Sequence, residues 1–474
     1  MTTARPARIR PNHRPSGDEE GRAPRPGRRA TRLAVLASAT VLSVAALAVP
    51  AQAVAPGSAA SAAGPAAVQA QYGQQGLDRA ALSASLEAVH TAGMYGVHSS
   101  VRNGSATWRG AAGFADIDTK RPMQPYFEHR IGSITKTFTA VAVLQQVQAG
   151  RIELDAPVGR YLPRLIDGER GRQVTVRMLL NHTSGIGDYI LPAFPGLIED
   201  PGKTLEANRF RHIEPEELVR LGLAAQPAAP RGTYAYSNTN YIIAGLLLEK
   251  VTGEDAEAHI TRNVIRKAGL KHTYFPRTAR ITGPHAKMYE SMYGTIDPAR
   301  DFSVYDMSWA GTAGAMVSTM DDLNDFYRKL LGGKLLRPAE LREMKTTVPA
   351  SEAEPGQEAP FHYGLGLYSL RMPNGTTYWG HDGGVFGAGT WALSTEDGKR
   401  QVAVANNLMK YERFDEQNQP KPNPIGAALL GYVDGALLGG RVPAPAPLTE
   451  RAPAPLTGPV PAPQSLASPQ QLLR

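Results

Sequence analysis

Two hairpin signals near opposite ends of the chain constrain its fold most. Segments 97–101 and 107–112 alternate like strands around Asn103-Gly104, and segments 390–394 and 400–405 do the same around Asp397-Gly398. Asn-Gly and Asp-Gly between such segments favour tight hairpin turns. We therefore expect strands from both chain ends.

Helical patterns surround and separate these hairpins. Apolar residues recur at helical spacing before the first hairpin, between the two and after the second, over 82–89, 138–147, 175–181, 238–252, 319–331 and 425–438. The pattern predicts an α+β fold: one antiparallel sheet built from both chain ends with flanking helices, interrupted by a mostly helical insertion over about 140–310.

Charge is concentrated at the amino end. Residues 1–53 contain nine Arg and three Asp+Glu, which leaves 42 basic against 40 acidic residues for the rest of the 474-residue chain. A nearly neutral body is a poor match for nucleic-acid binding. The chain has no cysteine, which excludes disulfides, thiolate zinc sites and a cysteine nucleophile.

The basic head is typical of an export signal. An arginine-rich stretch, 25–32, precedes the apolar run 33–49 and the cleavage-like Ala51-Gln52-Ala53. We expect a signal peptide over 1–53, secretion without a transmembrane anchor, and a flexible spacer over 54–76. Arg28-Arg29 leaves the general and the twin-arginine export routes open.

The folded domain is expected over 77–440, followed by a Pro/Ala-rich tail. Residues 441–474 repeat Pro-Ala-Pro-Leu-Thr and cannot bury a core. We interpret this segment as a disordered tail, with a cell-wall tether or a removable pro-segment as alternatives.

Three short motifs occur in one order: Ser133-Ile134-Thr135-Lys136, Tyr236-Ser237-Asn238 and His381-Asp382-Gly383. On a helix, Ser133 and Lys136 would share one face, so that the lysine could activate the serine hydroxyl. Gly132 would allow a close backbone approach there. Each motif is weak by itself, but their joint order indicates a serine acyl-transfer site.

Tyr236 and Asn238 would complete the proton transfer and substrate contacts. A lysine ammonium beside Tyr236 should lower the pKa of the phenol, which could then relay a proton. The Asn238 amide could contact a substrate carbonyl or amide. As alternatives, Tyr236 is an ordinary loop aromatic and Asn238 caps the next helix.

His381, Gly383 and Gly384 follow a strand-like run. His381 could assist proton transfer or attract a carboxylate, and the glycines would let substrate lie against the strand edge and expose N–H donors. His362-Tyr363-Gly364 also matches His-x-Gly, but a histidine at a strand start is the better interpretation there. No zinc-protease or G-x-S-x-G motif occurs, and the phosphate-loop-like segment 196–204 has the wrong spacing. We expect neither a cofactor nor a metal.

These residues resemble serine β-lactamase-like hydrolases, close to class C β-lactamases and secreted D-alanyl-D-alanine carboxypeptidases. The resemblance runs from about Tyr95 to Asn407. It includes residues 132–138, 175–185, 232–253 and 363–367. It implies that Ser133 is acylated, that Lys136 and Tyr236 share proton transfer, and that Asn238 orients the substrate. The N–H groups of Ser133 and Gly384 would form the oxyanion hole, and His381 would replace the usual lysine. Trp309 resembles a pocket-lining aromatic, with core packing as an equal alternative.

The resemblance implies a carboxypeptidase acting on peptidoglycan-type peptides, but one position departs from that pattern. Carboxypeptidases of this type carry His-Thr-Gly-Thr, and here Asp382 and Gly384 replace the two threonines. An anion would repel a substrate carboxylate. An esterase or D-amino-acid amidase, or a penicillin-binding sensor without turnover, therefore stays as an alternative, with a small peptide, ester or β-lactam as the ligand.

Overall fold

The computed structural model describes residues 76–352, 358–372, 375–415 and 421–438. The predicted signal peptide, nearly all of the spacer and the tail lie outside these residues. Among the described helices, none is both long and apolar enough to cross a bilayer.

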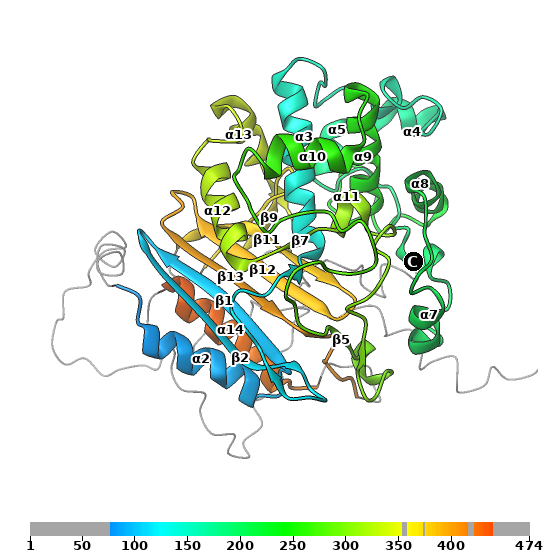
Figure 1. Cartoon of the computed structure of the whole chain (residues 1–474). Helices are drawn as coiled ribbons and strands as arrows, with labels where there is room; N and C mark the ends of the chain where they lie inside the picture. The colour runs from blue at the N-terminus through cyan, green and yellow to red at the C-terminus, as the bar shows by residue number, and fades with distance from the viewer. Residues whose placement is uncertain (1–75, 353–357, 373–374, 416–420, 439–474) are drawn as a thin grey trace, which may run out of the picture.

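A nine-stranded sheet forms the centre of the molecule (Figure 1). Every neighbouring pair in it is antiparallel. The strands, in spatial order, are β3 (Arg121–Pro122), β2 (Ala106–Asp116), β1 (Gly96–Asn103), β13 (Arg400–Asn406), β12 (Ala388–Thr395), β11 (Thr377–Val385), β10 (Tyr368–Arg371), β9 (Phe361–Tyr363) and β8 (Val348–Pro349).

Both predicted hairpins are present, and β1 pairs with β13 to join the two chain ends. Val97 lies opposite Asn406, and Asn103 lies opposite Arg400. The prediction of one antiparallel α+β sheet built from both ends is confirmed. Smaller sheets join β4 (His129–Arg130) to β7 (Val317–Ser318), and β14 (Leu408–Met409) to β5 (Tyr289–Glu290) and β6 (Arg300–Asp301).

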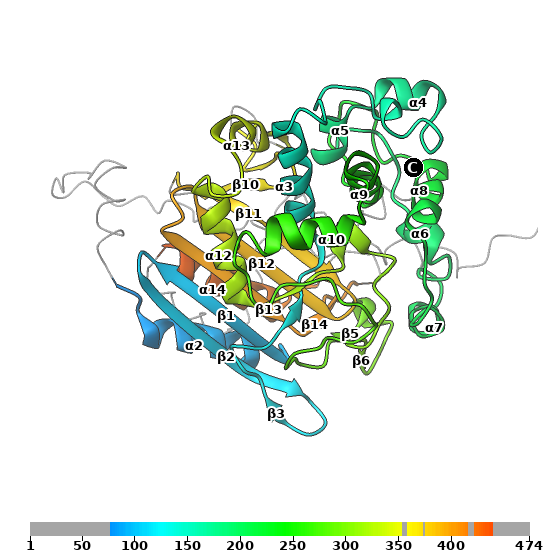
Figure 2. The same ribbon diagram turned by 45° about the horizontal axis from the view of Figure 1, so that its top comes forward.

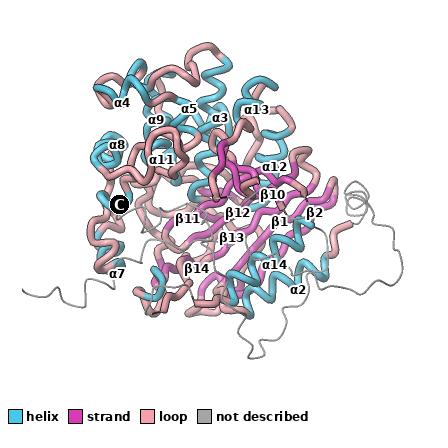
Figure 3. The backbone as a smooth tube through the Cα atoms, turned by 180° about the vertical axis from the view of Figure 1, so that it is seen from behind, coloured by secondary structure: helices cyan, strands magenta, loops and turns pink. Residues whose placement is uncertain are grey.

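Helices cover both faces of the sheet. On one face, α2 (Arg79–Thr91) and α14 (Pro424–Leu438) lie side by side, as seen from behind in Figure 3. Buried residues that include Leu86, Val101 and Leu429 fill the layer between them and the strands. On the other face, α12 (Met320–Leu331) packs on β1, β12 and β13.

The helical insertion stands beside the sheet, and α3 (Thr135–Gln148) links the two parts (Figure 2). Its other helices are α4 (Gly168–Gln173), α5 (Val176–Leu180), α6 (Ile190–Ala193), α7 (Pro201–Ala207), α8 (Pro215–Ala224), α9 (Thr239–Thr252), α10 (Ala256–Ile260) and α11 (Gly311–Gly314), and α13 (Pro338–Met344) follows α12. Eleven of the fourteen α3 residues are buried, including Lys136. The helix that carries the candidate nucleophile is therefore held firmly in the core.

Candidate active site

Ser133 lies at the meeting point of the sheet and the helical insertion. It sits in a single 3-10 turn, Gly132–Ile134, directly before α3. Gly132 has a φ of +50°, and a Cβ there would lie 2.6 Å from the Gly384 nitrogen. A Cβ at Gly383 would lie 1.9 Å from the Ile131 carbonyl oxygen. The glycines thus allow β11 to lie directly against the turn that holds Ser133.

This contact brings together the backbone groups expected to form the oxyanion hole. None of the described backbone carbonyls accepts a hydrogen bond from the Ser133 N–H, and the Gly384 N–H borders the same turn. Two N–H donors converging beside a serine hydroxyl can stabilise the negative oxygen of a tetrahedral intermediate.

Lys136 is completely buried and makes three hydrogen bonds. Its Nζ lies 2.9 Å from Ser133 Oγ, 2.8 Å from Asn238 Oδ1 and 2.8 Å from the Ala313 carbonyl oxygen. Burial lowers the pKa of Lys136 to about 7, although the carboxylates of Asp188 and Asp382 oppose this. A neutral amine has two N–H donors, which match Asn238 Oδ1 and the Ala313 carbonyl. Its lone pair then faces the Ser133 hydroxyl, as a general base requires.

Tyr236 lies beside Lys136, but its expected pKa was wrong in sign. The Lys136 Nζ lies over the Tyr236 ring, 4.9 Å from the ring centre. Burial raises the pKa of Tyr236 well above its usual value, and the Ser133 side chain lowers it only in part. The hydroxyl lies beside the Ser133 side chain but makes no well-aligned hydrogen bond within the described part of the chain. Tyr236 is therefore a neutral phenol that faces the reaction centre.

Asn238 occupies the N-cap position of α9, yet its side chain does not cap the helix. Its Oδ1 accepts from Lys136, and its Nδ2 donates to Asp188 Oδ2 at 2.8 Å. The alternative that the Asn238 side chain caps the next helix is therefore wrong, because both ends of its amide are used inside the site.

His381 is brought to the site, but it is neutral and already bonded. It is 1 % exposed, and its Nε2 lies 2.8 Å from the Tyr363 hydroxyl, while its Nδ1 lies 2.5 Å from the Asp382 carbonyl oxygen. Burial lowers the pKa of His381 to about 3. The expectation that His381 attracts a carboxylate is wrong, because a neutral imidazole carries no charge at physiological pH. Asp382 lies next to it, and burial raises the pKa of that carboxyl to about 6.

Trp309 lies in the core. It is 5 % exposed, and its ring packs on Phe386 at 4.9 Å and edge-on to Phe194 at 5.7 Å between ring centres. Its carbonyl accepts a hydrogen bond from the Tyr189 hydroxyl at 2.5 Å. The structure thus favours core packing over pocket lining for this residue.

Three residues of the site were not identified from sequence. Asp188 holds Asn238. His182 stacks on Tyr236 with 4.1 Å between ring centres, and its Nδ1 accepts from the Ser237 N–H. Tyr363 bonds His381. His182 lies inside segment 175–185, which resembles the family, and Tyr363 lies inside the second His-x-Gly match, 362–364. These two sequence matches are the signals that could have identified His182 and Tyr363.

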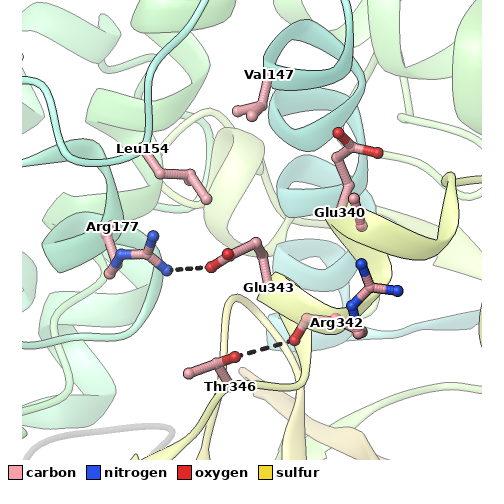
Figure 4. A pocket seen from close by; sticks show the side chains of 8 residues that line it. Val147, Leu154, Arg177, Glu340, Arg342, Glu343 and Thr346 are labelled. Carbon is pink, nitrogen blue, oxygen red and sulfur yellow. Dashed lines mark hydrogen bonds and ion pairs between the residues drawn. The ribbon is translucent and has the colours of Figure 1, made fainter.

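A separate recess lies away from this site, among α3, α5 and α13 (Figure 4). It has a volume of about 550 Å³ and is lined by Val147, Leu154, Arg177, Ala339, Glu340, Arg342, Glu343 and Thr346. Arg177 donates to Glu343 at 2.7 Å and to both carboxylate oxygens of Asp155. The Arg177 guanidinium is therefore already paired with two acidic side chains and is not free to bind an anionic ligand.

The fold and the Ser133–Lys136 pair define a serine hydrolase of the β-lactamase and penicillin-binding type. The chain belongs to the Beta-lactamase family, whose family model matches residues 79–421.

Solved structures resemble it over most of its length. A D-stereospecific amidohydrolase from Streptomyces sp. is 35 % identical, with a TM-score of 0.66 over 77 % of this chain and 99 % of that one. A D-amino acid amidase from Ochrobactrum anthropi SV3 is 26 % identical, with a TM-score of 0.62 over 76 % and 97 %. The fold is thus shared with amidases.

Curated relatives match over shorter stretches. Esterase EstB of Burkholderia gladioli is 34 % identical over 42 % of this chain and 53 % of its own length. The putative penicillin-binding protein PbpX of Bacillus subtilis is 28 % identical over 58 % and 62 %. The chain therefore spans less than two thirds of the length of either relative.

Proposed function

We propose that the protein hydrolyses amides and esters of D-configured acyl groups through an acyl-enzyme on Ser133. The observation that carries this proposal is the buried Lys136 amine, whose Nζ lies 2.9 Å from Ser133 Oγ. The similarity to a D-stereospecific amidohydrolase supports the choice of acyl configuration.

The reaction follows from the order of the contacts. Lys136 takes the Ser133 hydroxyl proton as Oγ attacks the substrate carbonyl, and the Ser133 and Gly384 N–H groups stabilise the oxygen that becomes negative. The resulting ammonium is stabilised by Asn238 Oδ1 and the Ala313 carbonyl. Tyr236, as a neutral phenol, passes a proton to the leaving amine or alkoxide and recovers one from Lys136. Water then hydrolyses the acyl-enzyme by the reverse sequence of proton transfers.

The motif His381-Asp382-Gly383 favours a leaving group without charge over a D-alanine leaving group, which carries a free carboxylate. His381 is neutral above its pKa of about 3, and Asp382 becomes an anion above about 6. Neither offers positive charge to a terminal carboxylate at neutral pH. Both features support an amidase or esterase and weaken the carboxypeptidase alternative.

The test is a panel of purified-enzyme rates. We expect turnover of a p-nitrophenyl ester and of D-amino-acid amides, with the L-amides much slower, and loss of all turnover in Ser133→Ala. Acyl-D-Ala-D-Ala should react no more than about tenfold faster than its C-terminal amide. A preference for the free acid of several orders of magnitude would establish a carboxypeptidase. Stoichiometric acylation without turnover would establish a sensor.

Asp382 gives this panel a pH dependence of known sign. As pH rises through about 6, Asp382 ionises and should repel a substrate carboxylate but not an amide. The ratio of kcat/KM for free acid over amide should fall about five- to tenfold, which corresponds to about 1 kcal/mol for a hydrated charge pair. Asp382→Asn should remove the slope; a slope that persists in that variant would assign the effect to another group.

A further inference from the structure

Asp188 lies in the loop between α5 and α6, and its carboxylate determines how Asn238 is oriented. Its Oδ2 accepts hydrogen bonds from the Asn238 backbone N–H and from Asn238 Nδ2, both at 2.8 Å. Its Oδ1 accepts from the Ile190 N–H at 2.9 Å. Three N–H donors converge on two oxygens, an arrangement that suits an ionised carboxylate.

The orientation of the Asn238 amide follows from this contact. A carboxylate only accepts hydrogen bonds, so the Asn238 Nδ2 must face Asp188 and its Oδ1 must face Lys136, where it accepts at 2.8 Å. The reversed amide would place donors against the donors of Lys136 and an oxygen against an anion. Asp188 thus ensures that one Lys136 N–H has an acceptor other than Ser133.

The loop itself is fastened to the start of α9. The Gly187 carbonyl accepts from Ser237 Oγ at 3.0 Å and from Thr239 Oγ1 at 2.7 Å, and Ser184 Oγ donates to Asn240 Oδ1 at 2.7 Å. These bonds flank Asp188 and tie its loop to the residues on either side of Asn238. The distance between the two side chains is therefore built into the backbone.

We propose that Asp188 is a positioning residue for the general base: it holds Asn238 so that the Lys136 lone pair faces Ser133, and its charge stabilises the ammonium that forms. This inference rests on the proposed role of Lys136. It extends that role to a residue that bonds neither the nucleophile nor the base directly.

Several charged and titratable groups surround Lys136, and among the described residues Asp188 and Asp382 are its acidic partners. Asp188 and Asp382 both raise the pKa of Lys136, against its burial. Burial lowers the pKa of both nearby imidazoles, which are therefore neutral at physiological pH, and the neighbouring phenols carry raised pKa values; these groups are His182, His381, Tyr236 and Tyr241. Burial raises the pKa of Asp188 itself, while its bonds from Asn238 and Ile190 oppose the rise.

The experiment follows acylation of Ser133 by a fluorophosphonate across pH 5 to 9. Its first-order rate does not depend on the fraction of folded enzyme, so a poorly folding variant still gives a valid profile. Wild-type rates should rise through about pH 7 as Lys136 loses its proton. In Asp188→Asn, the plateau should fall about tenfold or more, and the rise should shift to lower pH, because one anion that stabilised the ammonium is gone.

An exchange variant tests the same geometry with the opposite sign. In Asp188→Asn/Asn238→Asp, the carboxylate would contact Lys136 directly and the amide would take the place of Asp188. The rise of the acylation rate should then occur at a higher pH than in the wild type. The proposal would be overturned if the pH midpoint of the acylation rate equalled that of the wild type in both variants. It would also be overturned if the midpoint moved in the same direction in both.

Two further variants separate the possible failures. Asp301→Asn is the matched control, because Asp301 also accepts two backbone N–H groups, from Met288 and Ser303, and lies in β6. It should keep the wild-type profile. Lys136→Ala should abolish the pH-dependent acylation. If Lys136→Ala acylates normally, the proposed function fails; if it does not, but Asp188→Asn behaves as wild type, only the role of Asp188 fails.

Discussion

The charge of Lys136 is decided by its surroundings rather than by its neighbours in sequence. An exposed lysine would be an ammonium at neutral pH and could not accept a proton from Ser133. Complete burial costs the charged form its hydration, and the two nearby carboxylates recover only part of that cost. The same burial keeps Tyr236 protonated. The structure therefore divides the roles: an amine base and a phenol that relays the proton.

The first prediction concerns the pH dependence of the free enzyme. Because only neutral Lys136 can act as base, kcat/KM for a neutral ester should rise about tenfold per pH unit below about 7 and level off above it. The midpoint should be visible in a profile measured from pH 5 to 9. Lys136→Ala should lower kcat/KM by about two orders of magnitude or more. A rate that still increases tenfold per pH unit up to pH 9 would show that burial does not lower the pKa of this amine.

Much of the site chemistry was readable from sequence, because the motif residues Ser133, Lys136, Tyr236 and Asn238 do meet in space. What sequence could not give is the balance between burial and charge. An ammonium beside a phenol predicts a lowered phenol pKa, yet burial of both groups reverses the result. The acidic partner Asp188 was also invisible, because its contact with Asn238 spans 50 residues and follows no local spacing.

At the scale of elements, the site depends on how closely β11 approaches the turn before α3. The hairpins and the main helices were predicted well because turn residues and apolar spacing are local signals. The contact between β11 and residues 131–133 joins segments about 250 residues apart, and only the glycines at 132 and 383 hinted at it.

The second prediction tests this approach with Gly383→Ala. The added methyl would lie 1.9 Å from the Ile131 carbonyl oxygen and 3.0 Å from the Ser133 nitrogen. We expect the strand and the turn to separate, with kcat reduced at least about tenfold and the free energy of unfolding reduced by about 1–3 kcal/mol. Ester kinetics and urea denaturation measure the two effects.

Gly426→Ala provides the control for that substitution. Gly426 lies in α14, where a Cβ would meet nothing within 4 Å. The same chemical change should keep full activity and stabilise the helix by up to about 1 kcal/mol. Equal losses in both variants would mean that the chain simply tolerates alanine poorly, independent of the contact between β11 and the turn.

At the scale of the whole molecule, the third prediction is export. The basic, apolar and A-x-A pattern of residues 1–53 lies outside the described structure, and we propose that it is removed during secretion. Amino-terminal sequencing of protein recovered from the culture medium should begin near Val54. A full-length product retained with the cells would contradict secretion. Disabling the twin-arginine pathway, and then the general pathway, would identify the route.

The last prediction concerns acid stability and involves His98 of β1 and His129 of β4. Both are buried, with ring centres 5.6 Å apart, and none of their four ring nitrogens has a hydrogen-bond partner among the described residues. Burial lowers the pKa of His98 to about 4, and the pKa of His129 also lies well below its usual value. Both imidazoles are therefore neutral in the folded protein at neutral pH, because burial outweighs the backbone groups at Pro125 and Gly389 that favour their protonated forms.

The sign of the effect follows from where the proton binds. Between about pH 6.5 and 4, the unfolded chain protonates His98 and the folded chain does not, so acid favours unfolding. The stability that His98 contributes is fully present above pH 6.5 and is lost as pH falls, by up to about 3 kcal/mol at pH 4. Glu257 and Glu412, whose pKa burial raises to about 7, act in the opposite direction, so the total pH dependence of the wild type mixes both.

A comparison with His98→Leu isolates this contribution, because the carboxylates are common to both proteins. Leucine cannot take up a proton in either state, so the variant should gain stability relative to the wild type as pH falls from 7 to 4. Urea denaturation at each half unit of pH would measure the difference in the free energy of unfolding. His212→Leu, at a side chain that is 63 % exposed, should stay parallel to the wild type throughout. If the free energy of unfolding of His98→Leu also runs parallel to that of the wild type across this pH range, the His98 imidazole must accept a proton inside the fold. The buried pair of His98 and His129 would then not limit the stability of the protein in acid.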